Sequence, residues 1–272
     1  MPAIQPDFLK KQSEELVQYF NIPEKFVVKY LDFLETFADR SRRSGIAGRP
    51  ASKIHSFQVK APVLKQVVKD LMPKIEDNPE ITLQICDRLW KQPNLECRQL
   101  CAHLLGAVRI NSPEKITNRL EIYIDKNTEE ILVDMLVIHG LSSFREQYPD
   151  EFLRLIEEWI SSDDPFYKKS AIRILIPLVE QQGTKTLPRI YNLIQPLVRN
   201  HTLEIYTDLL ELIEALIKYS PQETFFYLKR FLNLSDSQDT AMLIRSSLKN
   251  FPPEIQNELR KDLRKHRAGE NK

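Results

Sequence analysis

The amino-acid sequence predicts an all-α protein, and three observations support this prediction. The chain of 272 residues contains only 6 Gly but 17 Pro. Folds built on sheets and phosphate-binding loops need glycine at tight turns, whereas an all-helical chain can begin its helices with proline. Between the prolines, apolar residues recur at i, i+3, i+4 and i+7, and the alternation typical of strands is nearly absent.

Helix starts can be placed in order along the chain, because proline suits a first helical turn and Asn, Asp, Ser or Thr can cap one. The predicted starts are Pro6, Pro23, Pro62, Pro79, Asn94, Pro113, Asn127, Asp150, Pro165, Leu187, Leu203, Pro221, Asp239 and Pro252. The sequence therefore predicts about fourteen helices of ordinary length.

These starts recur as pairs. Every second start from Pro62 to Asp239 follows the previous one by 32 to 38 residues. Helix pairs that recur at this interval are typical of an α-solenoid. The aromatic and small residues of tetratricopeptide repeats are missing, so the sequence favours HEAT-like helix pairs, stacked as an ARM-repeat type superhelix in a single domain over residues 1–272. Such a stack leaves a concave surface on which a long partner would lie.

The composition indicates a folded, soluble protein. Hydrophobic residues make up 42% of the chain, and 39 Lys and Arg nearly balance 38 Asp and Glu. No window approaches the roughly 18 uninterrupted apolar residues that span a bilayer, and no apolar signal segment follows the first charges. Three cysteines do not make a disulfide framework. We therefore expect a cytoplasmic protein with no membrane partner.

Two basic segments stand out from an otherwise acidic chain. Residues 38–60 are predicted to form a flexible insertion, within which Ala38–Lys53 carries five basic residues against one acid. Its arginines are Arg40, Arg42, Arg43 and Arg49. Residues 260–272 form a basic C-terminal tail with six basic residues against two acids. Both segments are suited to neutralise phosphates, although a solvated insertion and tail would have the same composition.

A single carboxylate, Asp134, lies among seven apolar residues in the segment Ile131–Ile138. We expect Asn127 to cap this helix, with Glu130 at the third position. A helix that is apolar on every side is buried, so Asp134 should be at least partly desolvated. Such a carboxylate is either satisfied by a partner in the core or used for catalysis or ligand binding.

Metal and cofactor chemistry is not predicted. Cys97 and Cys101 share a helix face, but His103 lies well round the helix from Cys97, and no second pair completes four zinc ligands. The common motifs of nucleotide-binding proteins, zinc proteases and serine hydrolases are missing. We therefore expect no metal and no cofactor, and we expect the thiols, Trp90 and Trp159 to fill the core.

Three short motifs follow one another along the repeats. Val59-Lys-Ala-Pro-Val-Leu-Lys65 is similar to V-x-x-P-x-L-R, and Leu89-Trp90 with the later Glu96-Cys-Arg98 is similar to L-W…E-x-R. Trp159 with the later Lys168-Lys-Ser-Ala171 is similar to W…R-R-x-A. In this order, from about residue 57 to 250, the motifs resemble those of the HEAT-like DNA alkylation repair family, the AlkD-like DNA glycosylases. That family commonly has glycine at the position of Gln58.

The resemblance implies a site for excising cationic alkylated purines. It implies that Asp134 stabilises the positive charge developing on the deoxyribose, and that Lys168 and Lys169 contact the DNA backbone. The family's two tryptophans, which would cradle the nucleotide, are replaced by Glu130 and by a residue near Glu211 or Leu212. None of these side chains offers an aromatic face to a cation or a sugar.

Three functions are compatible with the sequence. The first is a DNA-binding protein that grips the backbone on its concave surface through Lys168, Lys169 and the four arginines of the basic insertion, with weak or lost N-glycosylase activity. The second is an active glycosylase in which Asp134 stabilises the oxocarbenium ion. The third is a non-catalytic scaffold that binds another protein. The sequence favours the first of these, with DNA as the partner.

Overall fold

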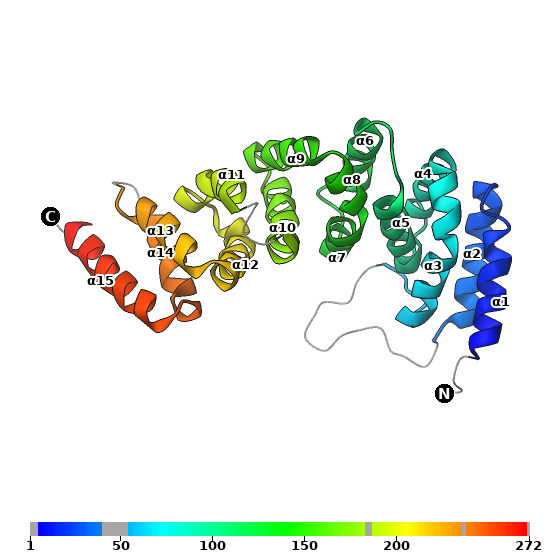
Figure 1. The fold of residues 1–272 in the computed structure, drawn as a ribbon, viewed down its shortest axis with the longest axis horizontal. Coiled ribbons are helices and arrows are strands. Elements are labelled where there is room, and N and C mark those ends of the chain that lie inside the picture. Colours follow the sequence, from blue (N-terminus) through cyan, green and yellow to red (C-terminus); the bar gives the residue numbers. More distant parts are fainter. Residues whose placement is uncertain (1–4, 40–53, 183–186, 235–237, 271–272) are drawn as a thin grey trace. The chain divides into compact units, whose positions relative to one another are not determined.

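The protein is all-α in the residues that its computed structural model describes, which are 5–39, 54–182, 187–234 and 238–270. Fifteen α-helices, one π-helical turn and one 3₁₀ turn occur in these ranges (Figure 1). Over the same ranges there is no β-strand, and only His55 and Asn94 form an isolated bridge. None of the described helices is both long enough and apolar enough to cross a membrane. The predicted fold class is confirmed.

The chain divides into two compact units, Met1–Phe152 and Leu153–Lys272. The first contains α1 (Pro6–Val17), α2 (Pro23–Phe37), α3 (Ala61–Asp77), α4 (Pro79–Trp90), α5 (Leu95–Ala107), α6 (Glu114–Tyr123), α7 (Glu130–Met135), the π-helical turn η1 (Leu136–Gly140) and α8 (Ser142–Gln147). After α9 (Pro149–Ser161), in which the boundary falls, come α10 (Pro165–Gln182), α11 (Leu187–Arg199), α12 (Leu203–Tyr219), α13 (Pro221–Leu232), α14 (Gln238–Ser247), the 3₁₀ turn η3 (Leu248–Asn250) and α15 (Pro253–Glu270).

Within each unit, alternate helices pack on one another, as stacked helix pairs require. In the first unit, α3 packs against α1 and α5, α5 packs against α7 and η1, and α2 packs against α4. In the second unit, α12 packs against α10 and α14, while α13 packs against α11 and α15. The helix starts that recur from Pro62 to Asp239 belong to α3, α5, α7, α10, α12 and α14. Within each unit these helices pack on one another, so the recurrence identifies one of the helix layers of that unit.

Most predicted helix starts lie within one residue of the observed ones. Proline occupies the first or second position of α1, α2, α3, α4 and α13. The prediction fails between residues 127 and 150, where one helix was expected and the chain forms α7, η1 and α8. The predicted start at Asn127 is three residues too early.

The predicted cap of α7 is wrong, because the residues before it form a separate turn. The N–H of Asn127 donates to Asp125 Oδ1 at 2.8 Å, and the N–H of Asp125 donates to Thr128 Oγ1 at 2.9 Å. The N-cap of α7 is Glu129, whose side chain makes no capping hydrogen bond. Short polar side chains commonly compete with helix starts in this way.

The tryptophans and thiols fill the core, as predicted. Trp90 and Trp159 are each only 8% exposed, and all three cysteines are buried as free thiols. Trp90 stacks on Tyr123 with 4.8 Å between ring centroids, and the Arg98 guanidinium lies 5.4 Å from the Trp90 ring. The L-W…E-x-R motif therefore joins α4 to α5 through a cation–π contact.

Buried Glu96 anchors Ser56 and Phe57, which lie near the end of the predicted insertion. Its carboxylate accepts hydrogen bonds from the Ser56 hydroxyl at 2.8 Å and the Phe57 N–H at 3.1 Å. The Asp39 N–H donates to the Phe57 carbonyl at 3.1 Å, so the two sides of the insertion meet here. The next residue, Gln58, has a φ of 56°, in the left-handed region that favours glycine. Glycine adopts this conformation without the steric cost that a Cβ atom brings, so Gln58 is strained here.

Candidate functional site

Asp134 lies on α7 and is half-buried. The prediction that its helix is buried on every side is wrong, because Ile131 is 40% exposed and Ile138 is 49% exposed. These three residues are spaced i, i+3 and i+7, so they share one face. The opposite face packs into the core through Leu132, Val133, Leu136 and Val137. Asp134 is therefore at the edge of the core, between two exposed aliphatic side chains.

Glu130 adds a second carboxylate to this surface. It is exposed and lies one helical turn before Asp134. Carboxylates four residues apart on a helix repel each other. The position that the resemblance assigns to a tryptophan therefore contributes negative charge instead of an aromatic face.

The chain after Asp134 forms the π-helical turn, and α5 approaches this turn closely. A Cβ atom added to Gly106 of α5 would lie 1.7 Å from the His139 carbonyl oxygen, so this approach requires glycine. The Ser142 hydroxyl donates to the His139 carbonyl at 2.7 Å and lies 3.1 Å from the Gly106 carbonyl. π-Helical turns are frequent at functional sites, and this one begins two residues after Asp134.

A pair of histidines joins α5 to the π-helical turn. The rings of His103 and His139 are 4.3 Å apart between centroids. Burial, the neighbouring His139 ring and the charge of Lys65 lower the pKa of His103 to about 4. Burial also lowers the pKa of His139 below its ordinary value. Both rings are therefore neutral at pH 7.

The predicted backbone-contacting lysines lie near the start of α10. Asp164 precedes this helix and accepts a hydrogen bond at 2.9 Å from the Phe166 N–H, which satisfies one free donor of the first turn. Lys168 and Lys169 follow in the next turn, and both side chains are partly exposed. Among described residues, no ion pair of Lys168 occurs.

Lys169 belongs to an ionic cluster that the sequence analysis did not identify. Its Nζ lies 3.7 Å from Oδ2 of Asp208 on α12. Arg173, one turn further along α10, donates from Nε to Asp208 Oδ1 at 2.8 Å. The Asp208 side chain is 8% exposed. Two signals in the sequence could have identified the cluster: two cations four residues apart on one helix, and an acid at helical spacing from the apolar residues that form the buried face of another.

The second predicted aromatic position also lacks a ring. Glu211 is exposed on α12, and Leu212 is fully buried in the core. Neither side chain presents an aromatic face.

The two basic segments are only partly described. Arg40, Arg42, Arg43 and Arg49 lie outside the described residues. Much of the predicted C-terminal tail is helical, because α15 continues to Glu270. Within it, Asp262 pairs with Lys229 of α13 at 3.1 Å, and Leu263 is buried.

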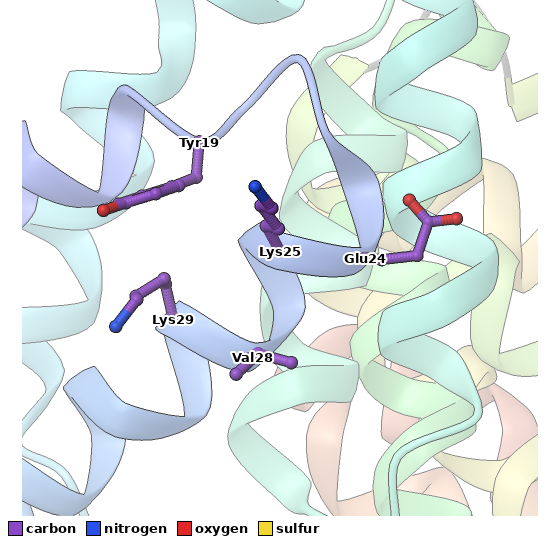
Figure 2. A pocket seen from close by; sticks show the side chains of 5 residues that line it. All are labelled: Tyr19, Glu24, Lys25, Val28 and Lys29. Carbon is purple, nitrogen blue, oxygen red and sulfur yellow. The ribbon is translucent and has the colours of Figure 1, made fainter.

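A pocket of about 400 Å³ lies beside α2 (Figure 2). It is lined by Tyr19, Glu24, Lys25, Val28 and Lys29, and Glu24 points away from the Tyr19 ring. Lys29 pairs with Asp32 at 3.2 Å, and this hydrogen bond raises the pKa of Lys29. Neither Asp134 nor the lysines of α10 belong to the lining of this pocket.

Comparison with known proteins agrees with the motifs. The family model described as DNA alkylation repair enzyme matches residues 31–251, which include α3 to α14. No curated protein matches the chain. The matched range contains Asp134, the two lysines of α10 and Asp208. The protein belongs to the DNA alkylation repair enzyme family, which points to a role related to DNA repair and to DNA as a partner.

Proposed function

We propose that the protein binds the DNA backbone through α10 and has weak or lost N-glycosylase activity. The observation that carries the proposal is the position of Lys168 and Lys169, which match the family's basic pair and lie partly exposed near the start of α10. Lysine ammonium groups neutralise phosphates without reading the base sequence. Binding through the backbone suits recognition of DNA by its shape or damage.

The surroundings of Asp134 support the second half of the proposal. An alkylpurine glycosylase must hold a cationic nucleotide while positive charge develops on the sugar. Here the neighbouring exposed residues are Glu130, Ile131 and Ile138, none of which offers a π-face. A carboxylate alone stabilises charge but does not orient the nucleotide, and positioning supplies a large share of enzymatic rate enhancement.

The test is a titration of the protein into labelled duplex and branched DNA at several salt concentrations. The logarithm of affinity should fall linearly with the logarithm of salt concentration. Lys168→Ala should reduce the magnitude of this slope by about 0.9, because one phosphate contact is lost. The control is Arg199→Ala, which removes the same charge from an exposed position in the last turn of α11. It should leave the slope nearly unchanged.

Two results would contradict the proposal. Binding that is insensitive to salt, or no binding, would favour a scaffold for another protein. Rapid release of 7-methylguanine from methylated DNA would favour an active glycosylase that uses Asp134.

A further inference from the structure

The two lysines of α10 differ in their ionic surroundings. Lys169 lies 3.7 Å from Asp208, whereas Lys168 has no ion pair with any residue that the structure describes. The side chains of Lys169, Arg173 and Asp208 are 28%, 18% and 8% exposed. A phosphate that approaches α10 therefore meets two different cations. Lys168 has no carboxylate partner among the described residues, whereas Lys169 already has Asp208 beside it.

Asp208 lies closer to Arg173 than to Lys169. A carboxylate as buried as this one requires a compensating cation. Arg173 supplies it through a hydrogen bond of 2.8 Å to Oδ1. Lys169 approaches the other oxygen only to 3.7 Å, which is longer than a hydrogen bond. Arg173 is thus the inner partner of Asp208, and Lys169 is the outer, more exposed one.

We propose that Asp208 competes with a DNA phosphate for Lys169 and thereby limits the affinity of α10 for DNA. This inference rests on the DNA binding proposed above. A carboxylate and a phosphate diester each offer Lys169 an oxyanion with one negative charge. When a phosphate takes Lys169, the ion pair with Asp208 is broken, and Asp208 keeps Arg173 alone. Lys168 binds a phosphate without breaking a pair.

The size of the effect follows from the exposure of the pair. Partly exposed ion pairs contribute little, so their loss corresponds to a change of about two- to five-fold in affinity. Removing the negative charge of Asp208 should therefore tighten DNA binding by about this factor. The slope of affinity against salt should steepen by up to about 0.9, since Lys169 then neutralises a phosphate fully.

The test is Asp208→Asn, measured by fluorescence anisotropy with a labelled duplex in the full-length protein. The amide keeps the shape of the side chain and an oxygen for Arg173 Nε, but removes the charge. The matched control is Glu204→Gln, which makes the same change in net charge at an exposed position in the first turn of the same helix. Asp208→Asn should tighten binding by about two- to five-fold more than this control.

A double-mutant cycle of Asp208 and Lys169 separates the proposed competition for Lys169 from the general effect of removing a negative charge. Lys169→Ala should weaken DNA binding more in the Asp208→Asn protein than in the native one. An equal loss in both backgrounds would overturn the inference while leaving DNA binding by α10 intact. Absence of salt-sensitive binding in the native protein would overturn both proposals.

Circular dichroism will show whether Asp208→Asn folds. If it does not, a second comparison tests the inference with Asp208 left in place. In the native background, Lys168→Ala should weaken binding more than Lys169→Ala does. An equal or larger loss from Lys169→Ala would overturn the inference.

Discussion

Replacing Glu96 with alanine should release Ser56 and Phe57, near the end of the predicted insertion. Glu96 is 3% exposed, and its carboxylate accepts hydrogen bonds from the Ser56 hydroxyl at 2.8 Å and the Phe57 N–H at 3.1 Å. After the substitution, both donors face a cavity, and a partly buried N–H loses its partner. Such an unpaired group bears the cost of its desolvation without compensation.

The two hydrogen bonds determine the size of the expected effect. Hydrogen bonds to a charged group contribute about 1.5–3 kcal/mol each. Because neighbouring contributions do not add fully, we expect the free energy of unfolding of the first unit to fall by about 3–5 kcal/mol. At about 2–4 °C per kcal/mol for a unit of this size, its melting temperature should fall by about 10 °C.

The assay is urea and thermal denaturation followed by circular dichroism. The control is Glu80→Ala, because Glu80 forms an ion pair with Lys115 on the surface and its side chain is 64% exposed. Exposed pairs of this kind contribute at most about 1 kcal/mol. If Glu96→Ala destabilised the protein by no more than this control does, the anchoring role of Glu96 would be refuted.

Gly106→Ala should destabilise the protein by about 1–3 kcal/mol, because its Cβ would lie 1.7 Å from the His139 carbonyl oxygen. Thermal denaturation checks this, and an unchanged melting temperature would contradict it. Stability should fall as pH drops from 6.5 toward 4, because the pKa of His103 is lowered from 6.5 to about 4 and the unfolded chain takes up the proton first. The urea midpoints at pH 7 and pH 5 should differ less in His103→Gln than in the native protein. Gln58→Gly should raise stability by about 0.5–1 kcal/mol, since φ is 56° there; urea denaturation showing a loss would count against it.

The repeat architecture could be predicted because its signals are local. Proline in the first turn marks helix starts such as Pro6 and Pro79, and apolar residues at helical spacing identify the buried faces. The recurrence of alternate starts then identified the layer that contains α3, α5, α7, α10, α12 and α14. These features depend on neighbouring residues or on spacing along the chain, so one sequence was sufficient.

The shape of the region around Asp134 could not be predicted in the same way. A π-helical turn differs from an α-helix by one residue in its hydrogen-bond register, which apolar spacing does not reveal. At this turn Gly106 closely approaches His139, and the two residues lie on different helices. The cap at Asn127 failed for a local reason, because Asp125 and Thr128 form a competing turn.

The ionic cluster on α10 also depends on a contact between distant residues. Arg173 and Asp208 are 35 positions apart and meet only because α10 packs on α12. The resemblance assigned Lys168 and Lys169 the same role, whereas among the described residues Lys169 has an ion pair and Lys168 has none. Family motifs thus indicated the residues that we propose to contact the DNA backbone, and the ion pairs distinguish the surroundings of the two lysines.

The most direct test of the account is a single-turnover experiment with methylated duplex DNA saturated by the native protein. Binding is confirmed in the same samples by anisotropy, and free 7-methylguanine is quantified over time against DNA without protein. We predict a saturated complex with slow or undetectable release of the base, because Glu130, Ile131 and Ile138 give the nucleotide no aromatic support beside Asp134. Rapid, protein-dependent release that Asp134→Asn abolishes would contradict the account.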